Sequence, residues 1–546
     1  MTLRFSSVPA PSDRLARPKG RAEHPLVVTL DEKSGPRALF SGDRLLEVDL
    51  PAGTRVIYPR PPMEPLKDVD AAIRYALNHP TGTGPLHAKL RPGMNVVIAV
   101  DDISLPLPPM RRPDVRERVL TIVLGMLADH GVEDVEIVIA TSFHRRMTAA
   151  EVRHIVGDRI FEAYWPDRLY NHDAEDPVGM KLVGTTDHGE VVELNRKAVE
   201  SDLLIYVNLN FVPMDGGHKS VATGLCGYKS LRAHHTPQVI RECRSYMDPA
   251  ASALSTSVER MGRLAEKSLN IFHIETTVNN RMFDRPLDLL HKNEDDWTGA
   301  ERATFKGLAF TLSRLPQPAR QAIFQRIPSP YGVTGVFAGE CEAVHEKTLE
   351  RCNAQYMVPL QGQSDILVAG IPYISPYNVN SFLNPLLVQV MVQGYFFNFY
   401  RGAPIVRKGG TMIVFHPCTD QFDQEHHAPY IEFVHDVLPQ TRDAVEMHRK
   451  FEEKFASNPA YLEMYRKGHA YHPAHPFFMW YWGEAGRQHL GRVIVVGADN
   501  DYIPKLLGWE TARTFAEALA MAQGGKRNPD ITMLHVPPIV MADVTL

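Results

Sequence analysis

The stretch NVVIAVDDISLPLPPMRRPDVRERVLTIVLGMLADHGVEDVEIVIA, residues 95–140, decides the fold class of this 546-residue chain. It opens with a short apolar run that is typical of a buried strand. Residues 114–132 then repeat apolar side chains at helical spacing, and residues 134–140 form a second strand-like run. Strand, helix and strand in this order predict a βαβ unit with parallel strands.

The same alternation continues along the chain. Thr148 and Glu151 have the spacing of a capping box and predict a helix start, and residues 202–208 predict a third strand. The C-terminal half predicts further strands at 365–370, 411–415 and 492–497 and a helix over 381–400. We therefore expect an α/β fold: two α/β domains with mainly parallel sheets and an active site in the crevice between them.

The length of the chain also favours two domains, because it exceeds what one ordinary core can hold. We place the boundary near Thr276, which gives an N-terminal α/β domain over residues 1–275 and a C-terminal one over residues 276–546. Residues 283–332 are charged and punctuated by proline, and they predict a helical insertion. We expect the N-terminal domain to carry the reactive groups and the C-terminal domain to close the substrate site.

Composition limits the partners and the compartment. Lys and Arg number 59 against 64 Asp and Glu, so no basic surface favours nucleic acid. The first 25 residues lack the apolar segment of a secretory signal, and the apolar run 386–400 is interrupted by Gln and Asn, which indicates a buried helix rather than a membrane span. Five scattered cysteines without a CxxC pair indicate neither disulfides nor structural zinc. We expect a cytoplasmic protein that acts on a small molecule.

Three unusual loops follow the predicted strands, at residues 101–109, 141–148 and 208–237. Ligands of open α/β sheets bind beyond the carboxyl ends of the strands, so these loops should converge on one crevice. The third loop is rich in glycine, histidine and lysine, although a flexible surface loop is the alternative interpretation.

Several familiar motifs are missing from the sequence. GLCGYKS departs by one residue from a phosphate loop, and no G-x-G-x-x-G follows a predicted strand, which argues against a nicotinamide dehydrogenase. The histidine groups DQEHHAP, YHPAHP and NHD lack HExxH spacing, so they are weak candidates for zinc ligands.

The order of five motifs resembles the family of nickel-dependent lactate racemases and related hydroxy-acid epimerases. The motifs are VVIAVDDIS, VEIVIATSFHRRMTAAEV, LNRKAVESDLLIYVN, GLCGYKS and SYMDPAASALSTSVERMGRLAE. The resemblance implies two α/β domains and a nickel-pincer nucleotide, a pyridinium-3,5-dithiocarboxylate-type mononucleotide bound to a lysine. It implies racemisation or epimerisation of a 2-hydroxy acid by proton-coupled hydride transfer through a keto acid. Enzymes of cofactor biosynthesis become expected partners, and a homo-oligomer is compatible with the family.

The resemblance also assigns roles to residues. Lys229 in CGYK resembles the attachment lysine, and His235 in RAHH resembles the nickel ligand, with His234 as the alternative. His144 in SFHRR matches the first catalytic histidine. For the second base we choose His218, although the family spacing counted from Lys229 falls on Lys219. Imidazole suits both directions of the reaction because its pKa lies near neutrality.

The residues expected to contact the substrate and the cofactor match the family only in part. Asp102 and Ser104 match the cofactor-binding loop after the first strand, but Leu105 stands where an arginine that clamps the substrate carboxylate is expected. This replacement predicts a substrate other than lactate. Candidate substrate contacts are Arg145, with Arg146, Arg111 or Arg112 as alternatives, and Asn380 and Trp482, with Trp480 as the alternative wall of the pocket.

Two other functions compete with this interpretation. A zinc-dependent lyase or hydrolase could use His144, His218 and His235. A non-catalytic protein that binds hydroxy acids or nucleotides on the same scaffold would explain the absence of the arginine at Leu105.

Overall fold

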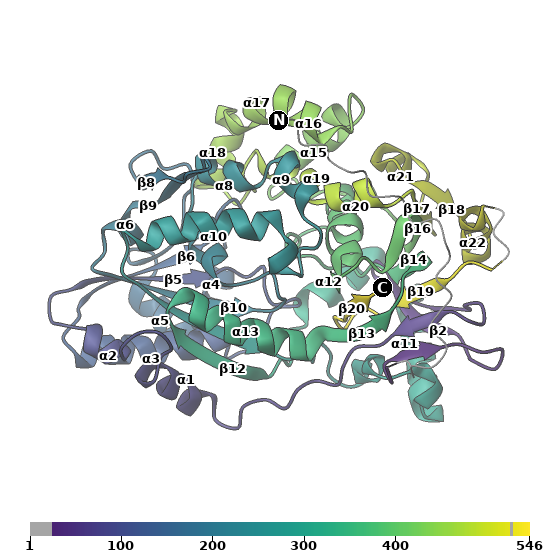
Figure 1. Cartoon of the computed structure of the whole chain (residues 1–546), viewed down its shortest axis with the longest axis horizontal. Coiled ribbons are helices and arrows are strands. Elements are labelled where there is room, and N and C mark those ends of the chain that lie inside the picture. Colours follow the sequence, from purple (N-terminus) through teal and green to yellow (C-terminus); the bar gives the residue numbers. More distant parts are fainter. Residues whose placement is uncertain (1–23, 525–527) are drawn as a thin grey trace, which may run out of the picture.

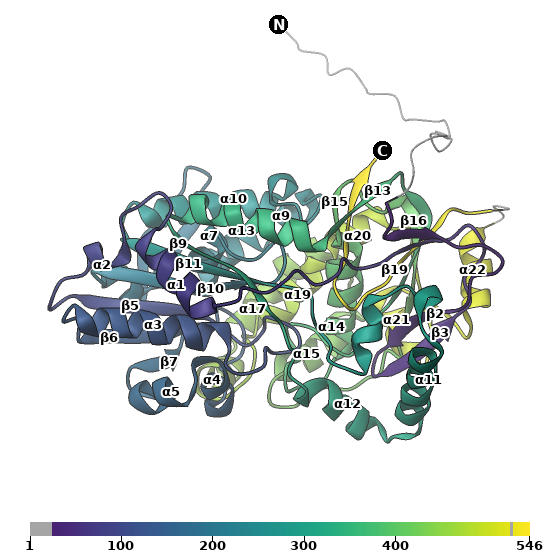
Figure 2. The ribbon, with the colours of Figure 1, turned by 90° about the horizontal axis from the view of Figure 1, so that it is seen from below.

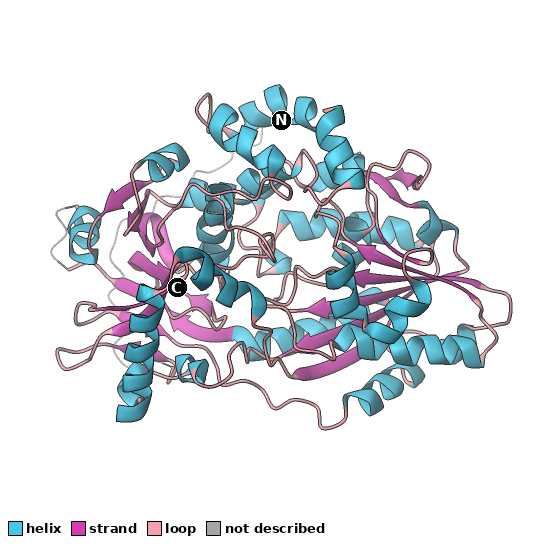
Figure 3. Ribbon diagram, turned by 180° about the vertical axis from the view of Figure 1, so that it is seen from behind, coloured by secondary structure: helices cyan, strands magenta, loops and turns pink. Residues whose placement is uncertain are grey.

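Two large β-sheets dominate the computed structural model, which describes residues 24–524 and 528–546. The sheets lie at opposite ends of an elongated molecule and helices cover both of them (Figures 1 and 3). This arrangement confirms the predicted α/β class with mainly parallel sheets. The prediction about a secretory signal falls almost wholly outside the described residues.

The first sheet grows from the predicted βαβ unit. Its six strands, in spatial order, are β12 (Val333–Gly339), β11 (Ile271–Val278), β10 (Leu203–Asn210), β5 (Asn95–Asp101), β6 (Asp134–Ala140) and β7 (Leu169–Asn171). Only β12 runs antiparallel to its neighbour. Every residue of β10 is buried, as expected for a parallel strand that is covered on both faces.

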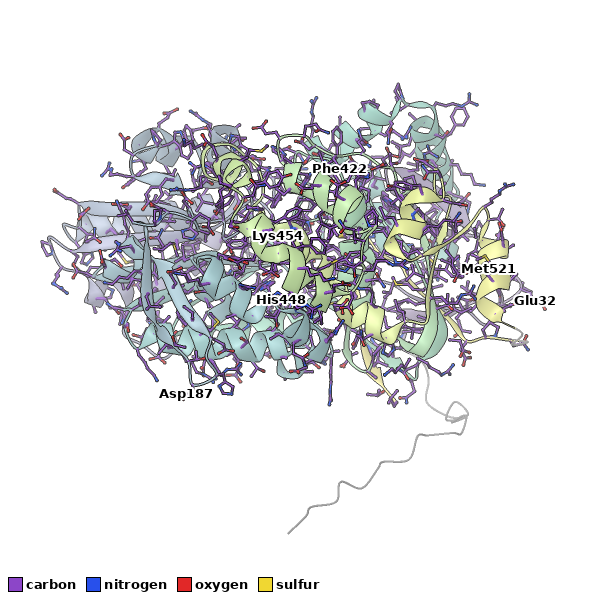
Figure 4. The ribbon with its side chains drawn as sticks, turned by 90° about the horizontal axis from the view of Figure 1, so that it is seen from above. Glu32, Asp187, Phe422, His448, Lys454 and Met521 are labelled. Atoms are coloured by element: carbon purple, nitrogen blue, oxygen red, sulfur yellow. The ribbon has the colours of Figure 1, made fainter. Side chains whose placement is uncertain are left out.

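Helices pack on both faces of this sheet, and the predicted capping box of Thr148 and Glu151 is present at the start of α4. The helices are α1 (Val69–Asn78), α2 (Leu86–Lys89), α3 (Val115–Asp129), α4 (Ala149–Val156), α5 (Asp158–Tyr164), α6 (Arg196–Glu200), α7 (His218–Gly224), α8 (Tyr228–His234), α9 (Pro237–Glu242), η1 (Pro249–Ala251), α10 (Ala253–Glu266) and α13 (Cys341–Tyr356). A hairpin of β8 (Met180–Thr185) and β9 (Val191–Asn195) projects from this half, with Asp187 at its tip (Figure 4).

The second sheet has seven strands and is parallel except for the β1–β4 pair. In order they are β1 (Val27–Thr29), β4 (Arg55–Ile57), β19 (Ile531–Leu534), β14 (Ser364–Gly370), β16 (Val406–Phe415), β17 (Arg492–Val496) and β18 (Glu510–Ala512). A small parallel sheet of β13 (Met357–Gln361), β20 (Met541–Thr545) and β15 (Tyr400–Gly402) lies beside it.

The structure divides the chain differently from the predicted ranges 1–275 and 276–546. That boundary falls inside β11, and β12 and α13 beyond it complete the first sheet. Conversely, β1 and β4 lie near the N-terminus but pair within the second sheet. The rule for parallel βαβ units does not anticipate edge strands such as β12 and β1, which pair in the antiparallel direction.

The predicted insertion is helical and holds η2 (Leu287–His291), η3 (Glu294–Asp296), α11 (Gly299–Arg314) and α12 (Gln317–Arg326). It packs on the hairpin of β2 (Arg37–Ser41) and β3 (Arg44–Val48), where Trp297 and Phe305 share a small core with Phe40 (Figure 2).

The remaining helices of the C-terminal half join the two ends of the molecule. The helix predicted over 381–400 is shorter and irregular: α14 (Pro385–Gln389) continues as a π-helical segment η4 (Val390–Tyr395) and a 3-10 turn η5 (Phe396–Asn398). The others are α15 (Ala428–Glu432), η6 (Phe433–Val437), α16 (Ala444–Met447), η7 (His448–Glu452), α17 (Glu453–Ala456), α18 (Pro459–Lys467), α19 (His475–Trp482), α20 (Glu484–His489), α21 (Tyr502–Leu507) and α22 (Phe515–Gln523).

His448 and Lys454 mark the outer helical layer in Figure 4. Among the described residues, no helix combines the length and apolarity that crossing a membrane requires.

Candidate active site

A cavity of about 230 Å³ opens at the carboxyl ends of β5, β6 and β10. The three loops expected to converge do line it, through residues such as Ser104, His144 and Val212. Its opposite wall comes from the C-terminal half, including Tyr377 and Trp482. We call this space the main cavity.

His144 and Asp102 form a hydrogen-bonded pair in the main cavity. The Nδ1 of His144 lies 2.7 Å from Asp102 Oδ2, and Ser104 donates its backbone N–H to the other Asp102 oxygen at 3.0 Å. Burial would raise the pKa of Asp102, but the charge and hydrogen bond of His144, with the Ser104 bonds, outweigh burial and lower it. An ionised Asp102 holds the Nδ1–H tautomer of His144, so Nε2 is the nitrogen that can accept a proton.

The backbone around His144 is held under constraint. Ser142, two residues earlier, has a φ of 47°, in the left-handed region that a side chain rarely adopts. Its N–H donates to Gly224 O at 3.1 Å, and its carbonyl accepts from the Tyr465 hydroxyl at 2.8 Å. These bonds fix the loop after β6 against α7 and against the C-terminal half.

Lys219 is the lysine that lines the main cavity. Its Nζ donates to Met214 O at 3.1 Å and lies 3.5 Å from Asp215 Oδ1. The preceding Gly216 and Gly217 both have positive φ, and a Cβ on Gly216 would come within 2.1 Å of Asn210 Oδ1. Two glycines are therefore required for the tight turn that brings Lys219 into the cavity.

His235 lines the cavity beside this lysine, with its ring stacked on Trp482 at a centroid distance of 5.9 Å. Its Nδ1 lies 2.8 Å from the Nδ1 of His234. Burial, with the neighbouring His234 and Lys219, lowers the pKa of His235 well below its ordinary value. The alternative ligand, His234, is fully buried outside the cavity lining, where burial lowers its pKa to about 3.

Two predicted residues lie outside the main cavity. The side chain of Lys229, the predicted attachment lysine, is 70% exposed and pairs with Glu193 at 3.4 Å on the surface. His218, predicted as the second base, points into a separate space lined by Cys341 and Glu342, which we call the rear hollow. Spacing along a loop does not reveal which side of α7 or α8 a residue faces.

The predicted substrate contacts Arg145 and Asn380 also lie outside the cavity lining. Arg145, only 4% exposed, pairs with Glu151 at 2.5 Å and donates to Val379 O at 2.9 Å. Asn380 donates to the same Glu151 at 2.7 Å. Glu151, which also caps α4, thus binds both Arg145 and Asn380 in a structural hydrogen-bond network. The predicted Trp482, in contrast, lines the cavity.

Three residues of the site were missed or set aside. Lys219 was weighed only as a base, although the Gly-Gly pair before it was the signal. His475, weighed as a zinc ligand, lines the main cavity, with its ring centroid 5.6 Å from that of His144. Asp101 also lines it, and burial raises its pKa to about 7. No sequence pattern distinguished His475 and Asp101 from ordinary buried polar residues.

Residues 41–248 match the family model of the lactate racemase N-terminal domain. This part of the chain is therefore similar to the N-terminal domain of lactate racemases. The matched region contains β5, β6, β10 and α7, which carry most of the polar groups of the main cavity. The resemblance seen in the sequence motifs is thus confirmed.

Two curated relatives are lactate racemases. The protein of Thermoanaerobacterium thermosaccharolyticum is 27% identical over 251 residues, which cover 44% of this chain and 52% of that protein. The protein of Lactiplantibacillus plantarum is 28% identical over 174 residues, or 31% of this chain and 38% of that protein. The chain therefore matches about half or less of the length of these relatives.

Solved structures extend the likeness of fold to nearly the whole chain. The lactate racemase apoprotein of T. thermosaccharolyticum superposes with a TM-score of 0.59 at 19% identity, covering 93% of this chain and 99% of that one. A protein from Thermotoga maritima gives a TM-score of 0.50 at 13% identity, covering 89% and 100%. The C-terminal half thus shares the fold even where its sequence has diverged.

Proposed function

We propose that the chain is a racemase or epimerase of a 2-hydroxy acid that uses a nickel-pincer nucleotide. One observation carries the proposal: a single cavity holds the His144–Asp102 pair, a lysine and a neutral histidine. The family relationship supports racemase chemistry.

The residues present fit such a cofactor. Lys219 supplies an amine inside the cavity, and His235 supplies an imidazole in the unprotonated form that binds metals. We propose that Lys219, rather than Lys229, forms the covalent link and that His235 is the nickel ligand. When bound, the group would supply a hydride acceptor next to the substrate carbon.

The chain's own residues would move the proton. His144 is placed to accept the substrate hydroxyl proton at Nε2, while the ionised Asp102 stabilises the imidazolium that forms. We propose His475 as the second imidazole, serving the other stereoisomer, because it lines the same cavity. Aromatic and aliphatic walls exclude water and strengthen these polar interactions.

The cavity walls favour a substrate larger than lactate. Leu105 lines the cavity where a carboxylate clamp was expected, and no arginine lines it in the part of the chain that the structure describes. The walls are instead apolar, with members such as Phe211, Met391 and Phe399. We propose a 2-hydroxy acid with a bulky aryl or branched alkyl group, because apolar surface stabilises such a group on burial.

The test is to produce the full chain together with cofactor-biosynthesis enzymes and to measure nickel and isomerisation. Enantiopure hydroxy acids of increasing size would be incubated and separated by chiral chromatography. We expect stoichiometric nickel and isomerisation of bulky substrates, both lost in His235→Ala and both kept in His188→Ala, an exposed control. Isomerisation by protein made without nickel or those enzymes would contradict the proposal.

The competing functions gain no support. The histidines that a zinc lyase or hydrolase would combine are separated, because His218 lies in the rear hollow while His144 and His235 line the main cavity. A non-catalytic binding protein does not require the hydrogen-bonded His144–Asp102 pair.

A further inference from the structure

The rear hollow, about 300 Å³ in volume, adjoins the main cavity and shares lining residues such as Lys219 and Leu254 with it. Three elements meet at its edge: His218, the first residue of α7, and Cys341, the first of α13, line the hollow, and Glu266, the last residue of α10, lies next to them. Figures 1 and 2 show α10 and α13 on the same part of the first sheet. The ligand atoms of these three residues all lie within 4.8 Å of one another.

The separations inside this cluster suit a shared ion better than direct hydrogen bonds. His218 Nδ1 lies 3.8 Å from Glu266 Oε1, and His273 Nε2 lies 3.6 Å from the same oxygen. Both distances exceed those of N–H···O bonds. Two ligands bound at about 2.1 Å in a tetrahedral shell would lie roughly 3.4 Å apart, close to the 3.8 Å between the His218 and Glu266 atoms.

A buried nitrogen without a partner points to the same place. His273 is 2% exposed, and its Nε2 has no hydrogen-bond partner in the structure although it faces the Glu266 carboxylate. Such an unsatisfied buried group is costly unless something completes its surroundings. Around an ion bound by Glu266, His273 could donate to the ligating carboxylate and fix its orientation.

The imidazole of His218 is already held in position. It is 4% exposed, and a Cβ on Gly262 of α10 would come within 2.4 Å of the His218 Cβ. Glycine at this position therefore lets the ring lie directly on the helix backbone. A ligand fixed in this way loses little conformational entropy on binding.

We propose that His218, Glu266 and Cys341 bind a divalent ion of the zinc class, at a site separate from the main cavity. One nitrogen, one carboxylate oxygen and one thiolate are ligands that zinc accepts, and the rear hollow leaves space for a water in the fourth position. The ion joins three distant segments and anchors the start of α7, whose next residue, Lys219, lines the main cavity. The proposal does not rest on the proposed function.

Cobalt(II) tests the site directly, because a cobalt–thiolate bond gives an intense near-ultraviolet charge-transfer band. The full chain would be treated with a chelator and titrated with cobalt(II), then with zinc(II) in competition. We expect a stoichiometric band in the wild type, its loss in Cys341→Ser and its retention in Cys352→Ser, another buried cysteine of α13. His235→Ala also keeps the band, which separates this site from the main cavity.

A second variant keeps the test informative if Cys341→Ser fails to fold. Glu266 is partly exposed, and Glu266→Gln should weaken zinc binding at least about tenfold in a chelator competition. Zinc should also raise the thermal unfolding midpoint of the wild type more than that of this variant. Absence of the band in the wild type, or unchanged zinc affinity in Glu266→Gln, would overturn the proposal.

Discussion

The main cavity and the rear hollow differ although neighbouring residues of one helix open into them. Lys219 lines the main cavity and also borders the rear hollow, whereas His218 lines the rear hollow alone. The main cavity is walled mostly by aromatic and aliphatic side chains, while charged groups such as Glu342 and Arg263 surround the rear hollow. The first environment favours desolvated chemistry on an organic substrate, and the second favours holding a cation.

The largest expected effect is a difference in activity between variants of His144, in the main cavity, and His218, in the rear hollow. His144→Asn should lower kcat/KM by about 10²- to 10⁴-fold, because it removes the general base. His218→Asn should cost far less, because that ring does not reach the main cavity. Steady-state kinetics on the same substrate checks both variants, and equal losses would contradict the assignment.

The next largest expected effect is a loss of stability on removal of Arg145, whose side chain forms a buried ion pair outside the main cavity. Arg145→Ala should lower the free energy of unfolding by about 3–5 kcal/mol, because it leaves the buried Glu151 carboxylate without its cation. Denaturant unfolding measures this loss, and Arg146→Ala, at a less buried site, serves as the control. A raised KM with unchanged stability would instead show that Arg145 contacts the substrate.

Much of the fold and part of the site were predictable from the sequence. Buried apolar runs and the Thr148–Glu151 box marked strands and a helix start because local chemistry determines them. The position of His144 at the main cavity follows from its loop, which comes directly after a parallel strand, whereas its proposed role came from the resemblance of SFHRR to a family motif. The sides of α7 on which His218 and Lys219 lie depend on packing against α10, and the pairing of Arg145 depends on how Glu151 is oriented.

Substrate preference offers a smaller and sharper test of the main cavity. Leu105→Arg places a cation where the wall is now apolar, so it should shift the ratio of kcat/KM values toward small hydroxy acids by roughly tenfold. Leu105→Met, which keeps the wall apolar, should leave that ratio near its wild-type value. Steady-state kinetics of both variants on small and on bulky hydroxy acids measures this ratio. An unchanged ratio of kcat/KM values in Leu105→Arg would contradict the proposed substrate pocket.

The smallest effect is an acid-pH dependence from Asp102. Its folded pKa lies below the ordinary value, so its stabilising contribution is present above about pH 4 and is lost as pH falls through the folded pKa. Asp102→Asn should therefore lose less stability than the wild type on acidification from about pH 5 to about pH 3. Urea unfolding at both pH values measures this, and parallel losses would show that Asp102 carries no lowered pKa.

The central claim is that Lys219, inside the main cavity, and not the exposed Lys229, carries the cofactor. Tryptic peptide mapping by mass spectrometry, on protein made with the cofactor-biosynthesis enzymes, tests it directly because the two lysines lie in separable fragments. We expect a mass increment and blocked cleavage at Lys219, both abolished in Lys219→Ala and unchanged in Lys229→Ala. An increment on Lys229, retained in Lys219→Ala, would contradict the claim.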